Sequence, residues 1–274
     1  MTTATLPRQA FVALLLRDVR VLRKNLKQFV LRTVMQPLLF TFVFAYVFPK
    51  IGQGIGGSTA GQAGGGPSFS TILVPGLLAV SMIFQGIQAV AMPLVQEFSF
   101  TKEIEDRVLA PMSVNLVGFG KVCNGAMQAA LSAFVVFPIV MLVHAEGEAP
   151  VVDIANPLLF VVVLVLASFL GASLGLLIGT SVAPQQVSLI FSIIVLPLTL
   201  LGCIYYPWST LDPIPWLKWA VLINPLVYMS EAMRAALTPS MPHMNVAVVL
   251  LAMVGATALL LFQSLRKFRQ RVVV

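Results

Sequence analysis

The stretch EFSFTKEIEDRVLAP, residues Glu97–Pro111, carries six charged side chains between two long apolar runs. Residues 71–96 upstream and 122–145 downstream contain no Asp, Glu, Lys or Arg. Each run is long enough for a helix that crosses a bilayer core, which takes about 20 residues. The charged stretch is therefore predicted to be a loop between two membrane spans.

Two interpretations of this loop, taken as residues 96–118, remain open. It is either a solvated connector or a surface that docks a water-soluble protein. Residues 103–107 predict a short polar helix that stops before Pro111, and apolar residues interleaved with the charges favour docking. The candidate contact residues are Glu97, Phe100, Thr101, Lys102, Glu103, Glu105, Asp106 and Arg107.

The composition predicts an all-α integral membrane protein. Of the 274 residues, 58 % are hydrophobic and 10 % are charged, against about 25 % charged in ordinary soluble domains. Uninterrupted apolar runs in lipid must be helices, and the alternation of a β-barrel is absent. The net charge of +7 comes from basic residues near the ends of the apolar runs, which indicates a bilayer partner and not nucleic acid.

Residues 1–28 predict an amphipathic helix that lies in the membrane interface. Apolar residues such as Phe11 and Leu15 recur at a spacing of three and four, and basic residues such as Arg17 and Lys24 occupy another face. The alternative is a plain basic stretch next to the first span. No signal-peptide pattern precedes that span.

Six spans are expected, at about residues 29–48, 71–95, 119–143, 157–182, 187–204 and 245–262. The 58 residues from Ile154 to Leu211 carry no charge and are too long for one span, so they must fold back near residues 183–186. In the fourth span, Gly171, Gly175 and Gly179 share one face where another helix can approach closely, within the subunit or in a dimer.

Residues 205–237 predict a re-entrant pair of short helices on the extracellular side, because four prolines and four charged residues interrupt them. Six spans with both termini inside place 14 of the 17 basic residues in the cytoplasm. Glu231 and Arg234 are three residues apart and would share a helix face. They either pair structurally or close an outer gate.

Catalysis by this chain is not expected. No phosphate-binding G-x-x-x-x-G-K-[ST] motif occurs. His144 and Glu146 are conceivable metal ligands. One histidine with acidic neighbours in a Gly/Pro loop is, however, typical of solvated surface. We therefore expect no cofactor and no metal in this chain.

The order of these elements resembles the ABC-2 type permeases across nearly the whole chain, as a single transmembrane domain. The most specific part runs through Tyr206-Pro207, Pro215-Trp216-Leu217, the run from Asn224 to Tyr228, and Glu231 to Arg234. The Ile104-Glu105 step, Ala110-Pro111 and Lys121 also resemble the family pattern, with Lys102 at the family's usual glycine. The chain looks closest to the daunorubicin-resistance and nodulation-factor exporters.

The resemblance implies a permease in the bacterial plasma membrane, as a homodimer or with a related permease. Two separate ATP-binding subunits would hold ATP and magnesium, and the charged loop would couple them to transport. The outer gate and substrate path would include Tyr206, Trp216, Tyr228, Glu231 and Arg234. We expect a drug-like or lipidic amphipathic substrate; the alternatives are a polysaccharide exporter, an ion-driven carrier and a structural or immunity protein.

Overall fold

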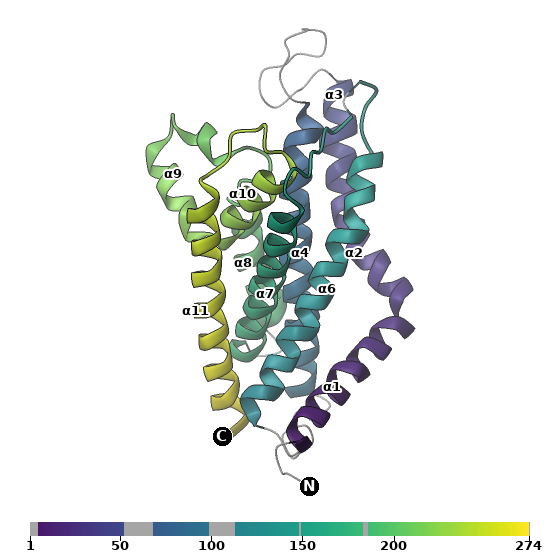
Figure 1. Ribbon diagram of the computed structural model, residues 1–274, viewed down its shortest axis with the longest axis vertical. Helices are drawn as coiled ribbons and strands as arrows, with labels where there is room; N and C mark the ends of the chain where they lie inside the picture. Colours follow the sequence, from purple (N-terminus) through teal and green to yellow (C-terminus); the bar gives the residue numbers. More distant parts are fainter. Residues whose placement is uncertain (1–4, 52–67, 99–112, 148, 183–185, 274) are drawn as a thin grey trace.

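The computed structural model describes residues 5–51, 68–98, 113–147, 149–182 and 186–273. Its described elements are all helical (Figure 1). The longer ones are α1 (Thr5–Lys24), α2 (Leu26–Thr41), α4 (Phe69–Gln96), α6 (Val114–Leu142), α7 (Pro157–Ser181), α8 (Val187–Leu200), α10 (Pro225–Leu237) and α11 (Val246–Val273). The short ones are the π-helix Phe42–Val47, α3 (Phe48–Lys50), the 3₁₀ helices Trp208–Leu211 and Val221–Ile223, and α9 (Pro215–Ala220).

Several helices begin where the sequence supplies a cap. The Asn156 side chain accepts a hydrogen bond from the Leu159 backbone N–H at 3.1 Å, with Pro157 in the first helical position of α7. Asn224 and Pro225 repeat this arrangement at the start of α10, where the Asn224 side chain accepts from Leu226 N–H at 2.9 Å. A capping oxygen satisfies a backbone donor that the helix leaves open, and proline fits where no donor is needed.

Five helices of the described chain are long and apolar enough to cross a membrane: Leu26–Val47, Phe69–Gln96, Val114–Leu142, Pro157–Ser181 and Val246–Val272. These correspond to the first four expected spans and the last. The expected fifth span, 187–204, is shorter in the structure: α8 has 14 residues, about 21 Å of helix. The six-span topology therefore depends on α8 and stays a prediction.

The region expected to be re-entrant contains short helices only. Its longest helix, α10, has 13 residues, too few for a span of about 20. The chain leaves α8 at Leu201 and turns at Cys203, whose φ of 51° is left-handed. A seventh span is thus absent from this region, while its depth in a bilayer stays a prediction.

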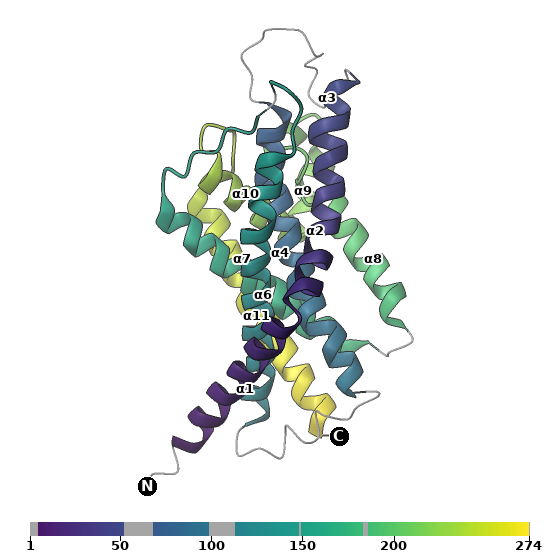
Figure 2. The same ribbon diagram turned by 90° about the vertical axis from the view of Figure 1, so that its right-hand side faces the viewer.

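The bundle is built around α4, which packs against α7, α6, α10 and α2. In the most apolar 18-residue part of α4, 89 % of the residues are buried, against 17 % in the corresponding part of α11. α4 is therefore the core helix and α11 an outer one. α7 in turn packs on α11 and α6. α8 has only sparse contacts with other helices and extends away from the bundle in Figure 2.

The glycine face predicted on the fourth span packs within this chain. A Cβ added to Gly175 would lie 2.9 Å from the backbone of Gly86 and Ile87, and one added to Gly171 would lie 3.1 Å from Ile83 Cα. Only glycine allows the α4 and α7 backbones to approach this closely. Of the two alternatives, packing inside the subunit is confirmed.

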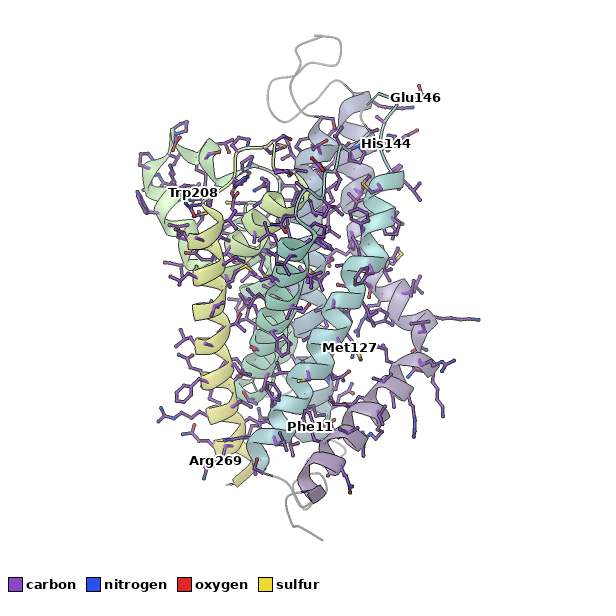
Figure 3. All side chains as sticks on the ribbon, in the orientation of Figure 1. Phe11, Met127, His144, Glu146, Trp208 and Arg269 are labelled. Atoms are coloured by element: carbon purple, nitrogen blue, oxygen red, sulfur yellow. The ribbon has the colours of Figure 1, made fainter. Side chains whose placement is uncertain are left out.

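Both chain ends lie at one end of the bundle, which we call the terminal end (Figures 1 and 2). The C-terminal half of α11 and the start of α1 are there. The opposite end, which we call the far end, holds α3, α9, α10 and the segment before α7. Figure 3 places His144 and Glu146 at the far end and Arg269 at the terminal end.

α1 is a helix over most of the predicted amphipathic segment, and its placement in the membrane interface stays a prediction. Its Phe11 ring stacks on Phe119 of α6, with ring centroids 6.3 Å apart, and Figure 3 shows this contact region at the terminal end. Val19, which follows Leu15 at the four-residue spacing of the predicted apolar face, is 40 % exposed. Asp18 is the less exposed neighbour, because the helix turns it toward the bundle.

Candidate functional site

Most of the predicted docking residues lie outside the described part of the chain. Phe100, Thr101, Lys102, Glu103, Glu105, Asp106 and Arg107 fall within residues 99–112, which the structure does not describe. Glu97 is described, and it is 7 % exposed at the C-terminal end of α4. Its carboxylate forms an ion pair with Lys121 of α6, which is 6 % exposed. Glu97 therefore joins the two helices that flank the loop and does not face outward.

The C-terminal part of α11 packs against the beginning of the loop. The Phe98 ring meets Phe268 edge-on, with centroids 6.2 Å apart, and the Arg271 guanidinium lies 4.5 Å from the Phe98 ring centroid. These contacts are a T-shaped aromatic pair and a cation–π contact. The loop thus leaves α4 at a point held by both α6 and α11.

Arg271 also closes the end of α7. Its Nη1 donates to the carbonyl oxygens of Gly179, Thr180 and Val182 at 3.2, 2.9 and 3.1 Å. The last carbonyls of a helix have no partner within it and carry partial negative charge, so a guanidinium satisfies both needs. Arg271, one of the basic residues that follow the last expected span, is therefore a structural cap for α7.

A polar cavity of about 470 Å³ lies at the terminal end, between α1 and α2 on one side and α4 and α6 on the other. Charged side chains of both signs line it: Arg17, Asp18, Arg32, Glu97 and Lys121. Amide side chains and a few apolar residues complete the wall, among them Asn25, Gln28, Gln96, Asn124, Gln128, Leu22 and Phe29.

A ladder of uncharged polar side chains leads from this cavity into the bundle. Thr33 Oγ1 donates to Gln85 Oε1 at 3.1 Å, Gln85 Nε2 to Gln128 Oε1 at 3.3 Å, and Gln128 Nε2 to Asn124 Oδ1 at 3.3 Å. The sequence analysis missed these residues. The available signal was the spacing of Lys121, Asn124 and Gln128, which puts three polar side chains on one face of an apolar helix.

At the far end, Glu231 and Arg234 form the ion pair that their spacing predicts. Both side chains are at most 1 % exposed. The Glu231 carboxylate also accepts from the backbone N–H groups of Trp208 and Met244, each at 2.9 Å, and Arg234 Nη2 donates to Cys203 O at 3.1 Å. The pair therefore ties α10 to the chain before α9 and to the chain before α11.

The other predicted gate residues are not grouped with this pair. Tyr228 donates to Leu222 O at 2.8 Å and packs against the main apolar core. Tyr206 packs against a small separate cluster that includes Val227. Trp216 on α9 is 73 % exposed. The structure thus holds the two tyrosines inside the far-end helices and leaves Trp216 outside them.

Cys203 lies against the buried pair and is fully buried. Burial, together with the nearby Glu231 carboxylate, raises the pKa of the Cys203 thiol to about 12. The thiol is therefore protonated near neutral pH, and because the thiolate is the reactive form, this cysteine is a packing residue.

The sequence matches one family of known proteins. The family model described as "ABC-2 type transporter" matches residues 9–238, which is 230 of the 274 residues. The match runs from α1 to α10. It includes the charged loop, the residues of the polar cavity and ladder, and the Glu231–Arg234 ion pair. A search of curated proteins finds no match.

Proposed function

The chain belongs to the ABC-2 type transporter family and is the transport permease subunit of an ABC transporter, and from this premise we propose that it exports a drug-like or lipidic amphipathic substrate. ATP hydrolysis takes place in a separate subunit. ABC-2 permeases normally pair with such an ATP-binding subunit. Beyond membership of the family, we propose a direction of transport, a substrate class and the surface that couples the two subunits.

The observation that supports the coupling proposal is the ion pair between Glu97 and Lys121. It joins the end of α4 to α6, the two helices that the charged stretch connects in sequence. A force on the loop would reach both helices, because they pack along their lengths. In this arrangement residues 99–112 contact the ATP-binding subunit and Glu97 holds the base of the loop.

The substrate proposal rests on the mixture of apolar and polar surface. Apolar side chains of α2 and α8 face outward, including Leu31 at 64 %, Leu39 at 57 % and Leu196 at 60 % exposure. The polar cavity and ladder lie beside them on α2, α4 and α6. An amphipathic molecule matches both surfaces, whereas a long glycan would require polar side chains along the whole path.

The assembly that fits these surfaces contains two permeases, identical or related, in a bacterial plasma membrane. α8 serves as the fifth of six spans, which places both termini in the cytoplasm with the charged loop. The far-end helices then form the re-entrant extracellular part. Glu231 and Arg234 hold that part together, and Trp216 is exposed where substrate would leave.

Co-purification with the ATP-binding subunit tests the coupling surface. Glu105→Lys should lower recovery of that subunit several-fold while the permease stays in the membrane, because charge pairs at a docking surface fix its register. Glu146→Lys makes the same change at an exposed site of the far end and should leave recovery unchanged. Full recovery and full transport with Glu105→Lys would exclude this loop as the coupling surface.

A further inference from the structure

More positive than negative side chains line the polar cavity at the terminal end. Arg17, Arg32 and Lys121 face Asp18 and Glu97. Lys121 is paired with Glu97, and Arg17 Nε lies 3.8 Å from Asp18 Oδ1. Arg32 makes no hydrogen bond or ion pair with any residue that the structure describes. One positive charge is therefore left facing the cavity.

Arg32 has a defined depth on the first span. It is six residues into α2, which begins at Leu26, so it lies about 9 Å along the helix. A cation at this depth in a membrane helix is costly unless it reaches water or an anion. Lipid phosphates are anions at the boundary of the hydrocarbon core, and the long arginine side chain can extend toward that boundary.

Arg32 also lines a second, much smaller cavity of about 20 Å³, together with Thr33, Gln36 and Gln85. It thus stands where the large cavity meets the polar ladder. Three and seven residues further along α2, Met35 and Leu39 are 49 % and 57 % exposed. These positions share a helix face with Arg32, so an anion bound at Arg32 would have an apolar surface beside it.

We propose that this cavity binds the phosphate headgroup of an anionic glycerophospholipid. The Arg32 guanidinium holds the phosphate through charge-assisted hydrogen bonds, the amides of Asn25 and Gln28 contact the glycerol side of the headgroup, and the acyl chains lie along Met35 and Leu39. The site goes beyond the proposed export function, because it can be occupied by a resident lipid or by a transported one.

Thermal melting of the purified full chain in a maltoside detergent measures this binding. Dioctanoyl phosphatidylglycerol should raise the melting temperature in a saturable way. Dioctanoylglycerol, which has the same chains without phosphate, and inorganic phosphate at the same concentration should not. An equal shift from dioctanoylglycerol would overturn the headgroup site, and an equal shift from inorganic phosphate would overturn its assignment to a lipid.

Variants locate the site. Arg32→Gln should raise the apparent dissociation constant for the phospholipid about tenfold, because a charged hydrogen-bond partner is lost. Lys27→Gln removes the same charge from an exposed position of α2 outside the cavity wall and should change it less than twofold. Equal effects of the two substitutions would mean nonspecific attraction and would overturn the proposal.

A third variant tests the cavity even if Arg32→Gln does not fold. Gln28→Glu places a negative charge on the cavity wall at an exposed position, so the protein should fold with its lipid-free melting temperature unchanged and bind the phospholipid several-fold more weakly. Unchanged affinity in Gln28→Glu, with Arg32→Gln folded and also unchanged, would exclude the cavity.

Discussion

Glu231 connects three segments of the far end through its carboxylate. Its carboxylate is shared by Arg234 and by two backbone N–H groups from separate segments. A buried charge left without its partner costs about 3–5 kcal/mol. The four groups therefore act as one unit, and the loss of one should be felt by all three segments.

We expect Glu231→Gln to lower the free energy of unfolding by about 3 kcal/mol, since it leaves the Arg234 charge buried without a counter-ion. Thermal melting and the amount of protein in the membrane measure this. Asp212→Asn is the matched control, because it breaks an ion pair with Lys218 in which the Asp212 side chain is 68 % exposed, and such pairs contribute about 0–1 kcal/mol. Normal stability with altered transport in Glu231→Gln would instead indicate a gate.

The Glu97–Lys121 pair gives a prediction of a different kind. Lys121→Met should destabilise the protein by about 3 kcal/mol, because the buried Glu97 carboxylate loses its ion pair with Lys121. The double variant Glu97→Leu/Lys121→Met should regain most of that loss, since two apolar side chains need no partner. Melting temperatures of the three proteins test the pair. A double variant as unstable as the single one would show that other contacts of these residues carry the effect.

Sequence spacing could predict one of these two pairs and not the other. Glu231 and Arg234 are one helical turn apart, so a local rule joins them. Glu97 and Lys121 are 24 residues apart on helices separated by the loop. Their contact depends on how α4 and α6 pack, and the six charges of Glu97–Pro111 made Glu97 look like part of the loop surface.

Among the elements, α4 and α7 approach each other closely enough for a local substitution to test the contact. Gly175→Ala should cost about 1–3 kcal/mol, because its Cβ would meet α4 backbone at 2.9 Å and backbone cannot rotate away. Gly255→Ala in α11 is the control: nothing lies within 4 Å of its added Cβ, and alanine favours helix by up to about 1 kcal/mol. Equal melting temperatures for the two variants would mean that α4 and α7 are not in close contact.

Element types could be predicted from the sequence because a helix is the only economical way to place an uninterrupted apolar run in lipid. Element ends were harder. The apolar run of the expected fifth span continues to Ile204, but α8 ends at Leu200 and the turn at Cys203 starts the far-end helices. Cys203 and Ile204 are apolar because they are buried in that region, and hydropathy alone does not distinguish such burial from lipid contact.

For the whole molecule, the two ends of the bundle can be assigned to the two sides of the membrane. In a protein with Cys123 replaced by Ala, a cysteine at Glu146 should react with an impermeant thiol reagent from outside, and one at Gln270 should react only after permeabilisation. Both positions are exposed, at opposite ends. Cys203 should stay silent, because it is buried and its pKa of about 12 keeps it a thiol. Labelling of position 270 from outside would show that the terminal end faces the outside and would contradict the proposed topology.

At this scale the charge distribution could predict that the start of α1 and the end of α11 share one end of the bundle, since 14 of 17 basic residues follow one topology. The polar cavity could not be predicted. Its lining comes from four helices, and amides such as Gln85 and Gln128 stand in runs that are otherwise apolar. A site assembled from residues this far apart becomes visible only when the helices are packed.

The cap that Arg271 provides to α7 has a consequence for the biosynthesis of the protein. The three carbonyl groups at residues 179, 180 and 182 leave the ribosome about ninety residues before the guanidinium that satisfies them. Since chains fold from the N-terminus as they are made, the end of α7 stays open until the ribosome has added Arg271. The permease can therefore close this end of the bundle only after the helices from α1 to α10 have been synthesised.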